Sequence, residues 1–276
     1  MCSRGTPPDA CTSPATRLPL ELVKIIIAYL FYDMRSLRAC TLTCYSWYTA
    51  AVPHLHRTLT IKSHYRIQNS LWPNPLRRMN TLGLLPLVKS LWVCGCNNGN
   101  VGPSTMPFDH RTLCQVSALT NVQELEVEYL DIPNLIPRIQ RYFKHFLPRL
   151  RSLGLMDPRG SDRQIIYFIG FFQHLQDLRL MFNGHHPRKQ PVIDLTLVPL
   201  FVPPLLGRLR MCCTTVGLVK GMIELFKGIR FEQIKLFHVE GMPLLLAAGA
   251  ETLKSLALTP DDPYGEKHSL DDICSS

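Results

Sequence analysis

The sequence is poor in charged residues and contains no long uninterrupted hydrophobic run. Charged residues make up only 18% of the chain and hydrophobic residues 46%, a balance that permits a sizeable core and excludes disorder as the main state. Lys24 interrupts the apolar stretch at 20–32, and prolines interrupt the one at 195–206. Neither stretch reaches the roughly 18 apolar residues of a membrane-spanning helix. The first 17 residues are polar and lack the apolar region of a secretory signal. We therefore expect a cytoplasmic or nuclear protein, with no membrane partner.

The sequence marks of catalysis are also missing. The chain has no G-x-G pair, no G-x-x-x-x-G-K-[ST] and no G-x-S-x-G, so phosphate-binding loops and hydrolase nucleophile elbows lack their motifs. His238 and Glu240 match half of a deaminase signature, but no P-C-x-x-C follows them. We expect a protein that is not an enzyme and has no catalytic residues.

The ten cysteines are expected to stay reduced, because a chain of this length without a signal is not typical of disulfide-stapled domains. Cys94 and Cys96 could bind zinc together with His110 or with His185 and His186, but the chain lacks a second close cysteine pair. We expect small buried side chains rather than ligands, and predict no metal and no cofactor.

The net charge is +9, from 30 basic and 21 acidic residues. Residues 159–240 hold 11 basic and 6 acidic residues, and the densest basic pieces are 77–78, 188–189 and 208–210. Such short pieces do not form a basic arm, which disfavours nucleic acid as the partner. A basic protein that binds nucleic acid remains the alternative.

Three short helices are predicted near the N-terminus, after a polar leader at 1–16. Apolar residues follow a helical period from Leu22 to Leu30, at positions 22, 25, 26, 29 and 30. Asp33 can cap a second helix, and a third continues past Trp47 despite Pro53. Three short helices form a small core, so we expect this module to dock on a partner, on the rest of the chain, or on both.

A six-residue pattern with apolar residues at positions 1, 4 and 6 recurs seven times beyond residue 59. The copies begin at 88, 122, 150, 175, 206, 231 and 253, so they are 22 to 34 residues apart. Each predicts a short strand, and several intervening segments predict helices, at 136–147, at 165–172 after a Ser161 or Asp162 cap, and at 218–226. This favours an α/β solenoid of about seven short parallel strands that alternate with helices. A compact α/β domain is the alternative.

The segment from Leu18 to about Arg57 resembles the F-box, specifically that of fungal F-box-like proteins. The resemblance rests on Leu18-Pro19-x-Glu21 and on SLRACTLTCYSW at 36–47. It implies a three-helix module that binds the Skp-type adaptor of an SCF-type cullin-RING ubiquitin ligase, followed by a domain that recruits a target for ubiquitin-dependent degradation. The residues at family positions that form or support the adaptor interface are Leu18, Pro19, Glu21, Leu22, Ile25, Leu37, Leu42 and Trp47. Ordinary core packing is the alternative for Leu22, Ile26 and Trp47.

The second region looks like degenerate leucine-rich repeats. The turn position that regular repeats fill with Asn or Cys matches only at Cys96 and Asn183, and the other repeats hold Leu130, Pro158, Thr214, Val239 and Asp261. We therefore expect stacked strands with irregular turns. The expected organisation is an F-box at 17–58, a substrate-binding repeat domain at 59–260 and an acidic tail at 261–276.

If the repeated apolar positions point inward, the residues between them line an open sheet face. That central column reads Trp92, Glu126, Gly154, Arg179, Arg210, Lys235 and Ala257, with Arg208 beside Arg210. We predict that Trp92, Glu126, Arg179, Arg208, Arg210 and Lys235 contact the target protein, the basic ones through an acidic or phosphorylated segment. Solvated strand positions without a partner, or a scaffold role independent of a ligase, are the alternatives.

Overall fold

The computed structural model describes residues 18–62, 75–95, 116–129, 131–143, 145, 147–182, 207–212, 214–225, 233–237, 239, 242–249 and 253–258. The predicted leader at 1–16 and acidic tail at 261–276 lie outside these residues. The chain divides into two compact units, Met1–Leu59 and Thr60–Ser276.

The first unit contains the three predicted helices, α1 (Leu20–Tyr29), α2 (Met34–Cys40) and α3 (Tyr45–Leu55). Asp33 caps α2 as expected, since its carboxylate accepts a hydrogen bond of 3.0 Å from the Ser36 backbone N–H. Helix α3 continues through Pro53 to Leu55. The unit thus consists of three short helices joined by tight turns.

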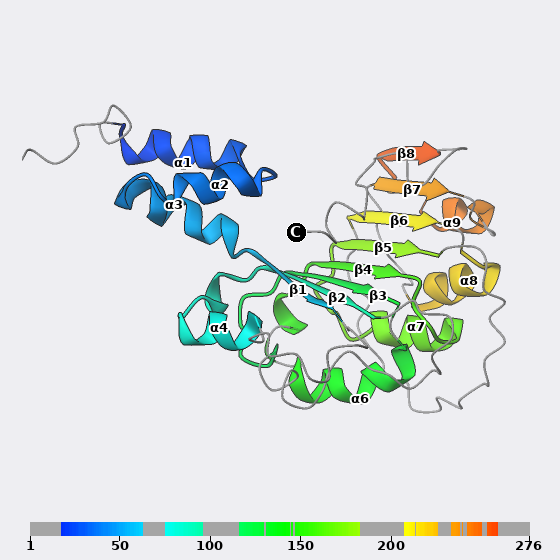
Figure 1. The fold of residues 1–276 in the computed structure, drawn as a ribbon. Coiled ribbons are helices and arrows are strands. Elements are labelled where there is room, and N and C mark those ends of the chain that lie inside the picture. The colour runs from blue at the N-terminus through cyan, green and yellow to red at the C-terminus, as the bar shows by residue number, and fades with distance from the viewer. Residues whose placement is uncertain are drawn as a thin grey trace, which may run out of the picture. The chain divides into compact units, whose positions relative to one another are not determined.

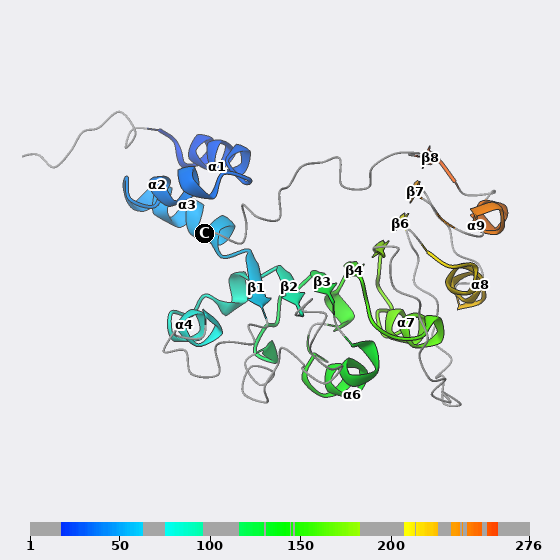
Figure 2. The ribbon, with the colours of Figure 1, turned by 45° about the vertical axis from the view of Figure 1, so that its right-hand side comes forward.

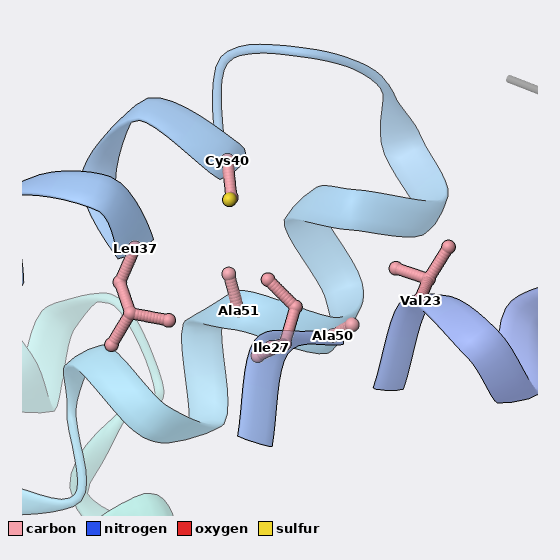
Figure 3. Packing of buried hydrophobic residues seen from close by; sticks show 6 residues of the cluster. All are labelled: Val23, Ile27, Leu37, Cys40, Ala50 and Ala51. Carbon is pink, nitrogen blue, oxygen red and sulfur yellow. The ribbon is translucent and has the colours of Figure 1, made fainter. Parts of the chain in front are cut away.

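A small apolar core holds these helices together (Figure 3). Its buried members are Val23, Ile27, Leu37, Cys40, Ala50 and Ala51, and the half-buried Leu30, Trp47 and Leu55 pack against them. The helical period singled out positions 22, 25, 26, 29 and 30, but of these only Leu30 packs against the core. The residues of α1 that are buried in the core are instead Val23 and Ile27. Helix α1 is apolar on two sides, and only one of them is used inside the unit.

The second unit is built on one parallel sheet whose strands are ordered as in the sequence, from β1 to β8 (Figure 1). The strands are β1 (Thr58–Lys62), β2 (Ser90–Cys94), β3 (Glu124–Glu128), β4 (Ser152–Met156), β5 (Asp177–Met181), β6 (Arg208–Cys212), β7 (Gln233–Phe237) and β8 (Ser255–Leu258). All seven predicted strands are present, which confirms a solenoid-like α/β fold. Strand β1 is an addition, marked in the sequence only by the alternation of Leu59 and Ile61, both buried.

The strands pair without any slip of register. The fourth position of the repeat pairs along the sheet from Leu91 to Leu256, and the sixth from Val93 to Leu258. Both positions are buried from β2 to β7. Because side chains alternate along a strand, these two positions point to the core and the residue between them points to the other face.

Helices and short 3₁₀ turns fill the gaps between the strands. They are α4 (Pro75–Thr81), η2 (Leu85–Leu87), α6 (Ile132–Tyr142), η3 (Leu147–Arg149), α7 (Asp162–Ile169), α8 (Val216–Leu225) and α9 (Met242–Gly249). In Figure 2 the strands follow an arc, with α6, α7, α8 and α9 on its convex side. The opposite, concave face of the sheet carries the central column of residues.

Two of the predicted helices match closely, and one begins earlier than expected. Ser161 caps α7 in a capping box with Gln164, and Leu218, Val219 and Met222 of α8 are buried as predicted. Helix α6 starts at Ile132 and ends at Tyr142, before Phe146 and Leu147. Its buried residues include Ile132 and Leu135, whereas Ile136 is only half-buried. Two prolines within it, Pro133 and Pro137, obscured its apolar stripe in the sequence.

The turns are more regular in their backbone hydrogen bonds than in their residues. After each of the strands β2 to β5, the next residue donates its N–H to the last residue of the following strand, as Tyr129 does to Met156 at 2.9 Å and Asp157 does to Met181 at 2.8 Å. Of the turn positions that departed from Asn or Cys, Pro158, Thr214 and Val239 are buried. Cys96, Leu130, Asn183 and Asp261 lie outside the described residues. The repeats stack although their turn residues differ.

Candidate protein-binding surfaces

The outer side of the three-helix unit is strongly apolar. Among the described residues, the exposed large hydrophobic side chains of this unit are Leu18, Leu20, Leu22, Ile25, Ile26, Tyr29, Tyr32, Met34, Leu42, Tyr45 and Tyr48. The second unit contributes only Leu82, Leu244, Leu256 and Leu258 to the same class. Eleven of these fifteen residues therefore lie within 31 positions of the chain.

Six of the eight predicted adaptor-binding residues lie on this surface. Leu22 is 47% exposed, Ile25 53% and Leu42 86%. Leu18, Pro19 and Glu21 are exposed as well, at the start of α1. The sequence left open whether Leu22 and Ile26 belong to an adaptor interface or to the core of the unit. Core packing is wrong for both, because both side chains are exposed in this structure.

The other two predicted adaptor-binding residues, Leu37 and Trp47, belong to the interior of the unit rather than to its exposed surface. Leu37 is completely buried in the core of the unit, so it is not available to a partner and can only support the surface. Trp47 is half-buried and packs against the same core. The aromatic side chains Tyr29, Tyr32 and Tyr45 were not singled out in the sequence as adaptor-binding, although each is more exposed than Ile25.

The concave face of the sheet assembles the predicted central column. Trp92, Glu126, Gly154, Arg179, Arg210, Lys235 and Ala257 are consecutive partners in the strand register. Arg208 and Lys235 are exposed, and Trp92, Glu126, Arg179 and Arg210 are half-buried. The structure thus brings all six predicted target-binding residues to one face.

An ion pair spans the middle of this face. Arg179 on β5 donates from Nη1 to Oε1 of Glu126 on β3 at 3.0 Å, across the intervening strand β4. Gly154 lies between them, and a Cβ at that position would be 3.1 Å from Cγ of Glu126. The missing side chain of Gly154 therefore lets Glu126 reach across to Arg179.

The acidic side of the column is crowded. Glu124, Glu126 and Glu128 alternate along β3 and so share one face. Burial raises the pKa of the Glu128 carboxyl, and the nearby carboxylates of Asp157 and Glu126 raise it further. The Cys94 thiol and the Trp92 indole act in the opposite direction and lower this pKa. The Trp92 N–H is shielded from solvent without meeting hydrogen-bond geometry to any acceptor.

The basic side is more open. The side chains of Arg208, Arg210 and Lys235 form no ion pair and no hydrogen bond within the part of the chain that the structure describes. The nearest carboxylate in the register is Asp177, the partner of Arg208, and its Oδ1 has no hydrogen-bond partner. This end of the face therefore presents three cationic side chains that can accept an anionic group.

Of the residues considered for metal binding or catalysis, only Cys94 lies within the described part of the chain. Cys96, His110, His185, His186, His238 and Glu240 fall outside it. Within the described ranges, no three His, Cys, Asp or Glu side chains are grouped so as to hold a metal ion, and Cys40, Cys44, Cys94 and Cys212 are thiols rather than disulfides.

No helix in the described ranges combines the length and the apolar character needed to cross a membrane. No protein-family model matches the chain, and no curated protein matches it either.

Proposed function

We propose that this protein is a substrate-recruiting adaptor of an SCF-type cullin-RING ubiquitin ligase, acting in the cytoplasm or the nucleus. In this proposal the three-helix unit binds the Skp-type adaptor, and the repeat unit binds the protein to be ubiquitinated. The resemblance of residues 18–57 to the F-box motivates the first role, and the charged concave face of the sheet supports the second.

The observation that carries the proposal is the exposed apolar side of α1. The helix already buries Val23 and Ile27 in its own unit, whereas Leu22, Ile25 and Ile26 lie outside that core and remain exposed. Large contiguous apolar patches on a soluble protein mark sites of interaction. This patch is therefore best explained as the contact surface of a partner protein.

The size of the patch is sufficient for a stable complex. Burying one large aliphatic or aromatic side chain contributes roughly 1.5–3 kcal/mol before the cost of association. Three or four of the exposed side chains, such as Leu22, Ile25 and Leu42, would together offset that cost. Pro19 and Glu21, exposed at the start of the helix, would lie at the rim of such an interface.

The mechanism is proximity rather than catalysis. A chain that holds a target on one unit and a ligase subunit on the other raises the effective concentration of the target near the ubiquitin-transferring enzyme. The chain itself then needs no nucleophile, general base or metal for ubiquitin transfer. Its contribution to specificity is the choice of target.

Co-purification with a fungal Skp-type adaptor tests the proposal. We expect the wild-type chain to recover the adaptor from a co-expressing cell, and the double variant Leu22→Asp/Ile25→Asp to lose at least about 90% of it, because two buried carboxylates are costly to desolvate. The matched control is Leu82→Asp, which introduces the same charge at an apolar residue of the second unit that is 58% exposed.

Two outcomes would contradict the proposal. One is that the wild-type chain recovers no adaptor. The other is that Leu22→Asp/Ile25→Asp retains full recovery while its circular dichroism shows three folded helices.

A further inference from the structure

The parallel sheet of the second unit ends at β8 with two core positions uncovered. Leu256 and Leu258 continue the two rows of apolar residues that are buried in every strand from β2 to β7, yet they are 41% and 52% exposed. Leu244 on α9 is 43% exposed as well. Within the described residues β8 is the last strand (Figure 1), so this end of the sheet is an exposed apolar edge.

This edge lacks the features that normally prevent a strand from pairing with another chain. An edge strand presents backbone N–H and C=O groups without partners, and proteins usually protect it with charged side chains, proline or a β-bulge. The sequence of β8 is SLAL, and that of α9 is MPLLLAAG. Neither element contains a charged residue, and β8 pairs with β7 without a bulge. The edge is therefore open to a further strand.

The sequence after β8 does not contain the pattern that covers the earlier strands. Each strand from β2 to β7 carries two buried apolar residues two positions apart. The hydrophobic residues within 259–276 are Tyr264, Leu270, Ile273 and Cys274, and no two of them are two positions apart. Residues that match Leu256 and Leu258 are instead present on a second copy of β8 itself.

We infer that two copies of this chain associate through β8, as antiparallel partners about a two-fold axis at Ala257. In an antiparallel pair, residues directly opposite each other share one face of the sheet. With Ala257 opposite its own copy, Leu256 lies opposite Leu258 of the second copy, and the axis forms the same pair again. The four leucines then cover one another on the core side, and the two small alanine side chains meet on the concave side.

The charges around the edge also suit a second copy. The chain has a net charge of +9, so a contact between two copies is favoured where cations are absent, as on β8 and α9. In the same register, the exposed Lys254 would be opposite position 260 of the second copy, where Asp261 and Asp262 follow in the sequence. The two-fold axis would create this combination of opposite charges twice.

Such an interface closes at two copies, because both copies use the same edge. The dimer carries two three-helix units and two concave faces. It would therefore hold a partner that offers two binding segments more tightly than one chain does. This inference goes beyond the proposed function and does not depend on it.

Sedimentation velocity of the full-length protein alone, at about 0.5 to 50 μM, tests the inference. We expect the mass to rise with concentration from that of one chain, 31.4 kDa, to twice that value. The variants Ala257→Glu and Ala257→Lys should each weaken dimerisation at least about tenfold, because like charges directly opposite each other repel. An equimolar mixture of the two variants should regain dimerisation, because opposite charges then meet at the axis.

Two control variants are expected to dimerise like the wild type. Ala118→Glu places the same charge at an exposed alanine between β2 and β3. Leu22→Asp/Ile25→Asp tests whether association uses the apolar surface of the three-helix unit instead. Circular dichroism checks that each variant is folded. If a charge variant at Ala257 is unfolded, amide exchange of the wild type decides: slower exchange of residues 255–258 at high than at low protein concentration supports the pairing, and equal exchange contradicts it.

Four outcomes would overturn the inference. The wild type stays monomeric at the highest concentration, its mass exceeds that of two chains, Leu22→Asp/Ile25→Asp is monomeric, or the mixture of folded Ala257→Glu and Ala257→Lys chains is no more dimeric than either alone. A monomeric wild type would assign the edge to a different occupant. Because the Skp-type adaptor is not added, failure here leaves the proposed function intact, whereas failure to recover the adaptor contradicts the proposed function alone.

Discussion

At the scale of single residues, Gly95 shows how closely the turns of neighbouring repeats approach each other. It follows β2 directly, and its N–H donates to the carbonyl of Glu128 at 2.7 Å. A Cβ at this position would lie 2.5 Å from the backbone carbonyl oxygen of Tyr129. Since that neighbour is backbone, it cannot move aside as a flexible side chain would.

We predict that Gly95→Ala destabilises the second unit by about 1–3 kcal/mol, the usual cost of forcing an extra carbon into a packed site. Urea unfolding followed by circular dichroism measures the loss. Gly207→Ala is the control, because the nearest atom to its Cβ would be at an ordinary contact distance of 3.5 Å. Equal stability of the two variants would show that the turns after β2 and β3 are not packed as described.

Glu128 is a second residue with a measurable consequence. Burial raises the pKa of its carboxyl, so the folded protein retains this proton to a higher pH than the unfolded chain does. The contribution of the protonated Glu128 to the stability of the folded protein is therefore complete below the ordinary glutamate pKa of about 4.3. It is lost as the pH rises through the raised pKa of the folded state.

We therefore predict that Glu128→Gln unfolds at a higher urea concentration than the wild type at pH 7, and that this difference shrinks as the pH falls towards about 4. Urea midpoints measured between pH 4 and pH 8 test this. Glu124→Gln on the same strand is the control for loss of one charge. A difference between Glu128→Gln and the wild type that does not change with pH would refute the assigned burial.

At the scale of secondary-structure elements, α1 has two apolar sides with different roles. Ile27 is completely buried against α2 and α3, whereas Ile25, two residues earlier, is 53% exposed. The periodic pattern in the sequence could not distinguish these sides, because nearly every residue from Leu20 to Leu30 is apolar. Only the packing of the three helices shows which side remains for a partner.

We predict that Ile27→Ala destabilises the first unit by about 2–4 kcal/mol, because it leaves a cavity in a small core. Ile25→Ala should change the stability by no more than about 0.5 kcal/mol. Pulse proteolysis of the full chain in increasing urea reports the stability of each variant. Similar losses for both variants would mean that Ile25 is packed inside the unit, and would remove the basis for an interface on α1.

The strands were predictable because a local rule controls them. Each strand from β2 to β7 repeats two buried positions two residues apart, and a parallel sheet without register slip brings those positions together, as in Leu153 and Leu155. Helix α9 was not predicted, since its sequence MPLLLAAG is apolar around its whole circumference and shows no helical stripe. Strand β1 was missed because only Leu59 and Ile61 mark it.

At the scale of the whole molecule, the column on the concave face could be listed from the sequence, but its contacts could not. The sequence places Glu126 and Arg179 53 residues apart, and only the intervening Gly154 lets them form an ion pair. Among the six candidate residues, Glu126 and Arg179 form an ion pair. The basic side chains of Arg208, Arg210 and Lys235 form none within the described residues. Likewise, the position of Leu37 in the F-box-like pattern did not reveal that it belongs to the core.

The central claim is that the outer surface of the three-helix unit binds a Skp-type adaptor. Hydrogen–deuterium exchange of the full chain, with and without a saturating amount of purified adaptor, tests it most directly, because binding to the folded form slows the opening of a small unit. We predict at least about a tenfold slowing of amide exchange in residues 18–55 and no change in strands β2 to β8. Unchanged exchange in residues 18–55, or slowing confined to the strands, would contradict the account.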